Sequence, residues 1–285
     1  MGTETAVLGN VRTGVRPLHR EHLPPPGTAV AVRLLGDFEV RVGVRTLSSR
    51  DWPRRHSAAL VKLLALVPGR SLHREQVLDA LWPDLDIGQA GPRLHKAAHF
   101  ARKTLGHRDA VVLGAETVRL YPGVEVHIDA TAFEQAAEAA LRDGDVAAAK
   151  AALALHNGVL LPHDLYEPWA EQHRAHLGRL YTELLHQAED WHQALAADAS
   201  DETAHLALAR RYAESGDRAA ALRQLDRLDE VMRRDLGLAP GRQAAALRHQ
   251  LTAEPPGSTS SGNALCCGQA SRSREPTGCG AGDRR

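Results

Sequence analysis

The sequence is poor in several residue types that would indicate particular classes of protein. Only 4% of its 285 residues are aromatic, and all three cysteines lie in the last stretch, from Cys266 on. The part of the chain before Cys266 therefore cannot carry a disulfide framework or a cysteine-based zinc finger. No apolar run approaches the roughly 20 residues of a transmembrane helix, and residues 1–27 lack the apolar core of a signal peptide. We expect a cytoplasmic protein without a membrane contact.

The chain also lacks the motifs of several enzyme classes. It contains no Gly-Lys pair, which excludes a phosphate-binding P-loop, and neither a Gly-x-Ser-x-Gly nor a Gly-x-Gly-x-x-Gly pattern. His95 and His99 have the spacing of helical metal ligands, but Lys96 stands where a zinc protease has its glutamate. Cys266, Cys267 and Cys279 do not have a finger spacing. We expect a protein that is not an enzyme, with no cofactor and no metal.

The charge of the chain is balanced overall and unevenly distributed. The formal net charge is zero. Residues 30–127 hold 15 Lys and Arg against 10 Asp and Glu, a net charge of +5, whereas residues 128–252 hold 13 against 20, a net charge of −7. This asymmetry indicates that only the first of these two parts meets a polyanion.

The two ends of the chain have no apolar periodicity. Residues 1–29 end in three consecutive prolines and a glycine at positions 24–27, and residues 253–285 are rich in Gly, Ser, Pro, Arg and Cys. Such compositions cannot bury enough apolar surface to fold. We predict a disordered amino-terminal extension over 1–29 and a disordered tail over 253–285.

Residues 30–127 predict strands, then three helices, then a hairpin. Alternating apolar residues indicate an antiparallel strand pair around the turn Gly36-Asp37, with a small strand near residues 46–47. A first helix opens at Asp51-Trp52-Pro53, with Asp51 as its N-cap, and ends at Pro68. The remaining elements are a second helix over 73–82, a loop over 84–88, a third helix over 91–105, a hairpin turning at 114–117 and a possible strand over 124–128. This order is typical of a winged helix-turn-helix.

The third helix is the element around which the chain is organised. Pro92 suits its first turn, and Gly106 suits a left-handed C-cap. An apolar face repeats at helical spacing: Leu94, Ala98, Ala101 and Leu105. The other faces carry several cations and no acid, as a helix in the major groove of DNA would. A solvated surface helix is the alternative.

Six residues of the third helix have a predicted contact with DNA. Arg93 and Lys96 lie toward the start of the third helix, where side chains reach base edges in helix-turn-helix proteins. We expect His99, Arg102 and Lys103 to reach phosphates. Phe100 either contacts a thymine methyl group or packs under the hairpin.

Three further arginines are candidates outside that helix. Arg54 and Arg55 crowd the first turn of the first helix, where the helix dipole also favours anions, so they either contact phosphates or are simply solvated. Arg119 in the hairpin is a candidate for contact with the minor groove or the DNA backbone.

The pattern of residues 128–252 predicts a series of helices with an internal repeat. Gly144-Asp145 and Gly216-Asp217 each precede an alanine-rich segment, and they lie 72 residues apart, near twice the roughly 34-residue tetratricopeptide period. Between them, residues 169–194 predict one long helix or two, and residues 202–214 another. We therefore predict a mainly α fold, in which a winged helix is followed by a tetratricopeptide-like helical domain.

Several separated segments, in the right order, carry a resemblance to a known family. In the first part they are residues 33–36 (Arg-Leu-Leu-Gly), 38–40 (Phe-Glu-Val), 74–83 (Arg-Glu-Gln-Val-Leu-Asp-Ala-Leu-Trp-Pro) and 102–106 (Arg-Lys-Thr-Leu-Gly). In the second part they are residues 164–169 (Asp-Leu-Tyr-Glu-Pro-Trp) and 235–240 (Asp-Leu-Gly-Leu-Ala-Pro). The chain thus resembles the Streptomyces antibiotic regulatory protein (SARP) family over residues 30–252.

The resemblance implies an OmpR-type winged-helix DNA-binding domain over 30–127 and a bacterial transcriptional activator domain over 128–252. It further implies that the protein activates transcription from promoter DNA, that the loop 84–88 contacts RNA polymerase, and that the helical domain contributes homodimerisation or a response to a signal. Larger members of the family continue into an ATPase module.

Two functions from different classes are compatible with these observations. The first is a sequence-specific DNA-binding transcriptional regulator. The second is a helical-repeat adaptor whose first domain has lost DNA binding and contacts proteins instead. The net charge of +5 and the absence of acids from the third helix favour the regulator.

Overall fold

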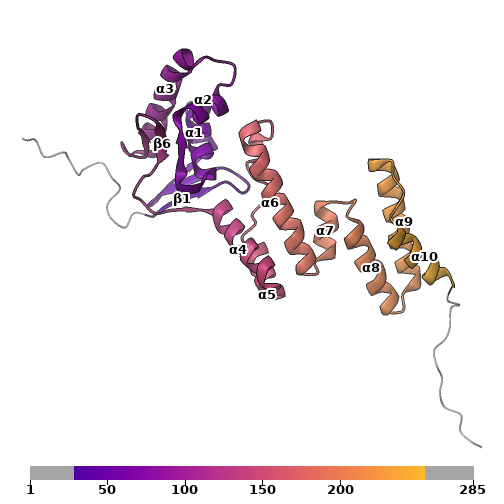
Figure 1. Ribbon diagram of the computed structural model, residues 1–285. Helices are drawn as coiled ribbons and strands as arrows, with labels where there is room; N and C mark the ends of the chain where they lie inside the picture. Colours follow the sequence, from indigo (N-terminus) through magenta and orange to yellow (C-terminus); the bar gives the residue numbers. More distant parts are fainter. Residues whose placement is uncertain (1–28, 254–285) are drawn as a thin grey trace, which may run out of the picture.

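The computed structural model describes residues 29–253 (Figure 1). A small α/β part is followed by helices that extend away from it in a row. The predicted disordered ends lie outside the described residues, apart from Ala29 and Ala253. Within residues 29–253, none of the helices combines the length and the apolar character needed to cross a membrane.

The chain opens with a sheet of four strands in the order β3-β2-β1-β7. The first three form an antiparallel meander: β1 (Val30–Arg33), β2 (Glu39–Val42) and β3 (Arg45–Ser48). The predicted strand pair around Gly36 and the small third strand are therefore confirmed. The fourth strand, β7 (Val126–Ile128), comes from far along the chain and pairs with β1 in parallel.

Three helices and a second sheet complete the winged helix. The helices are α1 (Arg55–Leu66), α2 (Arg74–Leu81) and α3 (Ile87–Leu105). The second sheet has the order β4-β6-β5, made of β4 (Ser71–His73), β5 (Val111–Leu113) and β6 (Thr117–Leu120). The hairpin β5–β6 is the predicted wing. Strand β4 was not predicted, because Ser71-Leu72-His73 contains a single apolar residue and so shows no alternation.

The predicted cap of the first helix is wrong. Asp51 accepts hydrogen bonds from the backbone N–H and the hydroxyl of Ser48, at 2.7 and 2.8 Å, and closes a short 3-10 turn (Ser49–Asp51). Trp52 is extended (φ −97°, ψ 107°), and α1 begins only at Arg55, after Arg54 as N-cap. The reason is Pro53, since a residue before proline is driven out of the helical conformation.

Helix α3 begins earlier than predicted. The carboxylate of Asp86 accepts from the backbone N–H of Gln89 at 2.9 Å, so Asp86 is the N-cap and Gly88 belongs to the helix. Pro92 therefore lies inside α3 and not in its first turn, and the bond that its N–H would make to the carbonyl of Gly88 cannot form. The predicted left-handed C-cap at Gly106 (φ 78°) is confirmed.

The remaining described elements are helical. In order they are α4 (Asp129–Asp143), α5 (Val146–Leu153), the 3-10 turn Pro162–Asp164, α6 (Pro168–Gln187), α7 (Trp191–Ala197), α8 (Glu202–Glu214), α9 (Arg218–Val231), the π-helical turn Met232–Leu236 and α10 (Arg242–Ala253). The segment 169–194, for which one or two helices were possible, thus contains α6 and the start of α7. The mainly α fold class is confirmed.

The two predicted repeats have the same local structure. Gly144 and Gly216 both adopt left-handed backbone conformations, with φ of 68° and 84°. The following aspartates are N-caps: Asp145 accepts from the backbone N–H of Ala147 at 2.9 Å, and Asp217 from that of Ala220 at 2.8 Å. Each repeat therefore turns one helix back onto its neighbour, α4 onto α5 and α8 onto α9.

One hydrophobic core extends from the sheet into the helical part. Val32 of β1, Leu60 of α1, Phe133 of α4 and Leu184 of α6 belong to the same buried cluster. Helices α8, α9 and α10 bury a second cluster, which includes Leu206, Leu225 and Leu251. The division of the chain at residue 127 stays a prediction, and packing is continuous across it.

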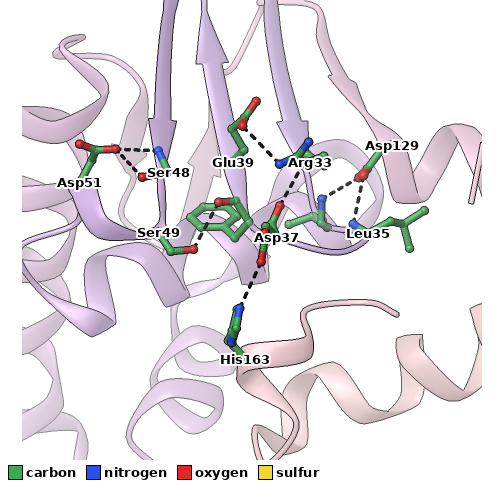
Figure 2. Close-up of polar contacts among 11 residues, drawn as sticks. Arg33, Leu35, Asp37, Glu39, Ser48, Ser49, Asp51, Asp129 and His163 are labelled. Carbon is green, nitrogen blue, oxygen red and sulfur yellow. Dashed lines mark hydrogen bonds and ion pairs between the residues drawn. The ribbon is translucent and has the colours of Figure 1, made fainter. Parts of the chain in front are cut away.

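Polar contacts reinforce this continuity where β1 ends (Figure 2). The Asp129 carboxylate, at the start of α4, accepts from the backbone N–H groups of Leu34 and Leu35 at 2.7 and 3.0 Å. Burial raises the pKa of Asp129 above its usual range, although these hydrogen bonds act in the opposite direction. The Asp37 carboxylate accepts from the His163 ring, in the segment before α6, at 3.1 Å.

The main chain itself also joins the two parts. The N–H of Gly36 donates to the carbonyl of Val159 at 2.9 Å, and the N–H of Leu161 to the carbonyl of Leu34, also at 2.9 Å. A Cβ atom on Gly36 would lie 3.0 Å from the carbonyl oxygen of Asn157. We call residues 157–167, which run along this edge and lead into α6, the junction segment.

Replacement of Asp129 by alanine should destabilise the protein by about 2–6 kcal/mol. The backbone N–H groups of Leu34 and Leu35 would lose their acceptor, at about 1–3 kcal/mol for each unsatisfied group. The free energy of unfolding from denaturant titration measures the loss. Asp143→Ala, at the exposed end of the same helix, is the matched control and should change stability by less than about 0.5 kcal/mol. Equal losses for both variants would contradict the assigned role of Asp129.

Candidate nucleic-acid interface

Helix α3 buries one side and exposes the opposite one. Leu94, Ala98, Ala101 and Leu105 are buried, which confirms the predicted apolar face. This side packs against α1, α2 and the wing strand β5. Two of these positions, Ala98 and Ala101, carry small side chains that let α3 lie close to its neighbours.

The outer face of α3 carries a row of basic side chains. Lys96, His99 and Lys103 are all exposed, and their spacing of three and four residues puts them on one stripe of the helix. Gln89, seven residues before Lys96, is exposed on the same stripe. The prediction missed Gln89, because the helix was expected to begin at residue 91. We call these four residues the outer stripe.

A shallow pocket lies beside the outer stripe, between α3, the start of α1 and the end of α2. Its volume is about 360 Å³, and its lining residues are Arg54, His56, Trp82, Arg93, Lys96, Ala97 and Phe100. Among the residues that the structure describes, no Asp or Glu lines it. The pocket therefore presents three side chains that are cationic at neutral pH and no fixed negative charge.

Two aromatic rings of this pocket pack against side chains at the start of α1. The Arg54 guanidinium lies over the Phe100 ring, 5.4 Å from its centroid, and the His56 ring stacks on Trp82 at 5.1 Å. Phe100 is half-buried, and the Arg54 guanidinium at the start of α1 is one of its neighbours. Burial lowers the pKa of His56 below its usual value, and the positive charges of Arg55 and Arg93 lower it further. The lowered pKa favours the neutral form of His56.

Arg102 and His95 face away from the outer stripe. The Arg102 side chain donates from Nε to the carbonyl of Val111, in β5, at 2.6 Å and is half-buried. The His95 ring nitrogen Nε2 lies 3.1 Å from the guanidinium of Arg74 in α2 and accepts its hydrogen bond. Both contacts hold α3 against its neighbours. Arg102 was predicted to contact a phosphate, and its hydrogen bond to Val111 competes with that contact.

The two adjacent arginines at the start of α1 have different surroundings. Arg54 lines the pocket, as described above. Arg55 forms an ion pair with Glu167, the last residue of the junction segment, and the other Glu167 oxygen accepts from the indole N–H of Trp169 at 2.9 Å. Arg119, the candidate in the wing, is exposed on β6. Sequence reasoning missed Glu167, because it lies 112 residues from Arg55.

A cluster of possible metal ligands occurs elsewhere, between α4 and α6. Ligand atoms of Glu134, Glu138 and His176 lie within 4.8 Å of one another. The Arg179 guanidinium lies 3.1 Å from Nδ1 of His176, and Nε2 lies 2.9 Å from Glu134. Since an arginine can only donate, the ring accepts at Nδ1 and donates from Nε2, which leaves no ring lone pair for a metal.

Taken together, the structure gathers most predicted contacts on one side of the winged helix. Arg54, Arg93, Lys96 and Phe100 share the pocket, and His99 and Lys103 continue along the outer stripe. Arg55 and Arg102 are held by protein partners.

Comparisons with known proteins identify the carboxy-terminal part of the chain. Residues 186–252 match the family model described as Bacterial transcriptional activator domain. This family is one of transcription regulators and not a class of enzyme. The match covers the end of α6 and helices α7 to α10, and it begins later than the predicted boundary at residue 128. No curated protein matches this chain.

The fold is similar to that of a solved structure, Mycobacterium tuberculosis EmbR in complex with a low affinity phosphopeptide. The TM-score is 0.59 at 18% sequence identity, and the similarity covers 79% of this chain. This chain spans 65% of the length of that EmbR chain. The resemblance to SARP-type regulators that the sequence predicts is confirmed by the activator-domain match, together with this fold.

Replacement of Arg102 by alanine should lower stability by about 1–3 kcal/mol, because the carbonyl of Val111 loses a charged donor. The matched control is Lys103→Ala, the next residue on the exposed side, which should change stability by less than about 0.5 kcal/mol. Thermal or denaturant unfolding measures both. Identical stabilities of the two variants would contradict the structural role of Arg102 and favour the predicted phosphate contact.

Proposed function

We propose that this SARP-like chain is a sequence-specific DNA-binding transcriptional activator that lays α3 in the major groove of promoter DNA. The observation that carries the proposal is the outer stripe of α3, where Gln89, Lys96, His99 and Lys103 are exposed on a helix without a single acid. An exposed helix of an ordinary soluble protein usually mixes both signs of charge. The outer stripe presents cationic and hydrogen-bonding side chains and no carboxylate, which suits the phosphates and base edges of a duplex.

Within the outer stripe, Lys96 has the best position for base contact. It lies near the middle of α3, between Gln89 and His99 on the outer stripe, and can donate to O6 and N7 of guanine. Gln89, nearer the start of the helix, can bond both N6 and N7 of adenine. His99 and Lys103 continue the stripe toward phosphates of the same groove.

Arg54 and Arg93 suit phosphate contact. They line the pocket beside α3 together with Lys96, and a backbone phosphate there would meet two or three positive charges. Arg93, which the sequence alone suggested for a base edge, lies on the α1 side of α3, away from the middle of the outer stripe. Arg119 of the wing is proposed to contact the minor groove or the backbone. Such contacts fix the position of the domain and read no sequence.

The activating part of the proposal rests on the activator-domain match and on the family resemblance. We propose that the turn between α2 and α3, with Asp84 and Asp86 exposed, contacts RNA polymerase, and that the helical half binds further protein partners or a second copy of the chain.

The proposal is tested by binding of purified protein to a duplex from its own upstream region and to random DNA, each titrated with salt. Lys96→Ala should weaken binding to the upstream duplex by about 1–3 kcal/mol and relax its sequence preference. Arg54→Ala should weaken binding to both duplexes about equally and reduce the salt slope by about one.

Thermal unfolding of both variants is the control for intact folding. Equal losses on the two duplexes for both variants would contradict the division between base and phosphate contacts. Binding of the wild-type protein to neither duplex at low salt would contradict DNA binding itself and favour the protein-interaction adaptor.

A further inference from the structure

Glu167 holds one of the arginines at the proposed DNA surface. Its carboxylate pairs with Arg55 through Oε1 and accepts from the Trp169 indole through Oε2. The Glu167 side chain is only 19% exposed, so it is fixed in place, whereas the Arg55 side chain is 77% exposed. The Arg55 side chain is therefore accessible to solvent even though its charge is paired.

This ion pair lies at the edge of the pocket. Arg54, the residue next to Arg55, covers Phe100 of α3, and His56 on the other side stacks on Trp82. The charge of Glu167 raises the pKa of His56, opposing the larger effect of burial, which places that charge within electrostatic reach of the pocket. A residue of the helical half thus contributes a negative charge to a surface that is otherwise basic.

We propose that Glu167 is a positioning residue that competes with a DNA phosphate for Arg55, and that the helical half thereby sets the affinity of the winged helix for DNA. The inference rests on the proposed DNA-binding function. A guanidinium can donate two parallel hydrogen bonds to a carboxylate or to a phosphate, so Arg55 can exchange Glu167 for a phosphate. Any movement of α6 that withdraws Glu167 releases Arg55 for a phosphate.

A second ion pair in the junction segment, Lys62–Asp164, differs from Arg55–Glu167 in that both of its side chains are shielded from solvent. The Lys62 ammonium lies 2.6 Å from the Asp164 carboxylate, and these side chains are 9% and 14% exposed. Neither can reach a ligand in solvent. The junction segment therefore has a buried pair that anchors it to α1 and, three residues later, a pair in which the arginine is exposed and free to turn away from its partner.

The experiment compares Glu167→Gln with wild-type protein on upstream and random duplexes between 50 and 200 mM salt. Glutamine keeps the shape of the side chain and an acceptor for Trp169, and it removes the charge that competes for Arg55. We expect tighter binding to both duplexes by a similar factor. One additional phosphate contact steepens the salt slope by about 0.9, so the variant should lose about 3.5-fold more affinity over this salt range than wild-type protein does.

Two controls separate this mechanism from a change in net charge. Glu171→Gln, one turn further along α6 and exposed, removes the same charge and should leave the salt slope unchanged. In an Arg55→Ala background, Glu167→Gln should give no gain in affinity for DNA. The ion pair is absent from both Arg55→Ala proteins, with and without Glu167→Gln, so any loosening of the junction segment affects them alike.

Several results would overturn the inference. They are an unchanged or weaker affinity of Glu167→Gln, the same gain in the Arg55→Ala background, and an equal gain from Glu171→Gln. If wild-type protein binds neither duplex, the proposed function fails and this inference fails with it. If wild-type protein binds DNA and Glu167→Gln does not differ from it, only the inference fails.

Discussion

The segment Leu34–Gly36, where β1 leaves the sheet, is bonded through its main chain to the helical half on two sides. Asp129 accepts its first two N–H groups, and the carbonyl of Val159 accepts the N–H of Gly36. Backbone groups have no other way to satisfy their hydrogen bonds once they are buried, so rotation of the two halves would leave these groups unpaired. This constraint fixes the junction segment against α1. The anchoring pair Lys62–Asp164 and the pair Arg55–Glu167 follow from that placement.

The sequence contained enough information for the order of the elements and for the orientation of α3. Apolar periodicity requires only that one side of an element is buried, and Leu94, Ala98, Ala101 and Leu105 are buried as that periodicity predicts. The same argument turned Lys96, His99 and Lys103 toward solvent. The turns at the two Gly-Asp repeats could be predicted equally well, because a left-handed glycine followed by a capping aspartate is a local structure that needs no distant partner.

What could not be predicted depends on competition between neighbours or on contacts between distant residues. Asp51 and Asp86 are both good caps, and only the effect of Pro53 on Trp52 decides that the first of them closes a 3-10 turn instead of α1. Glu167 has no mark in the sequence that ties it to Arg55, from which it is separated by 112 residues. The pocket beside α3 likewise exists only because α1, α2 and α3 converge there.

Chemical labelling of lysines tests the proposed DNA surface most directly, because the chain has only four of them, Lys62, Lys96, Lys103 and Lys150. Lys96 and Lys103 are exposed on the outer stripe, Lys150 is exposed on α5 in the helical half, and Lys62 is buried in its ion pair. Acetylation of the free and the DNA-saturated protein, read residue by residue by mass spectrometry, should show DNA protecting Lys96 and Lys103 while Lys150 reacts equally in both. Protection of Lys150, or unprotected Lys96 and Lys103 in protein that demonstrably holds DNA, would contradict the account.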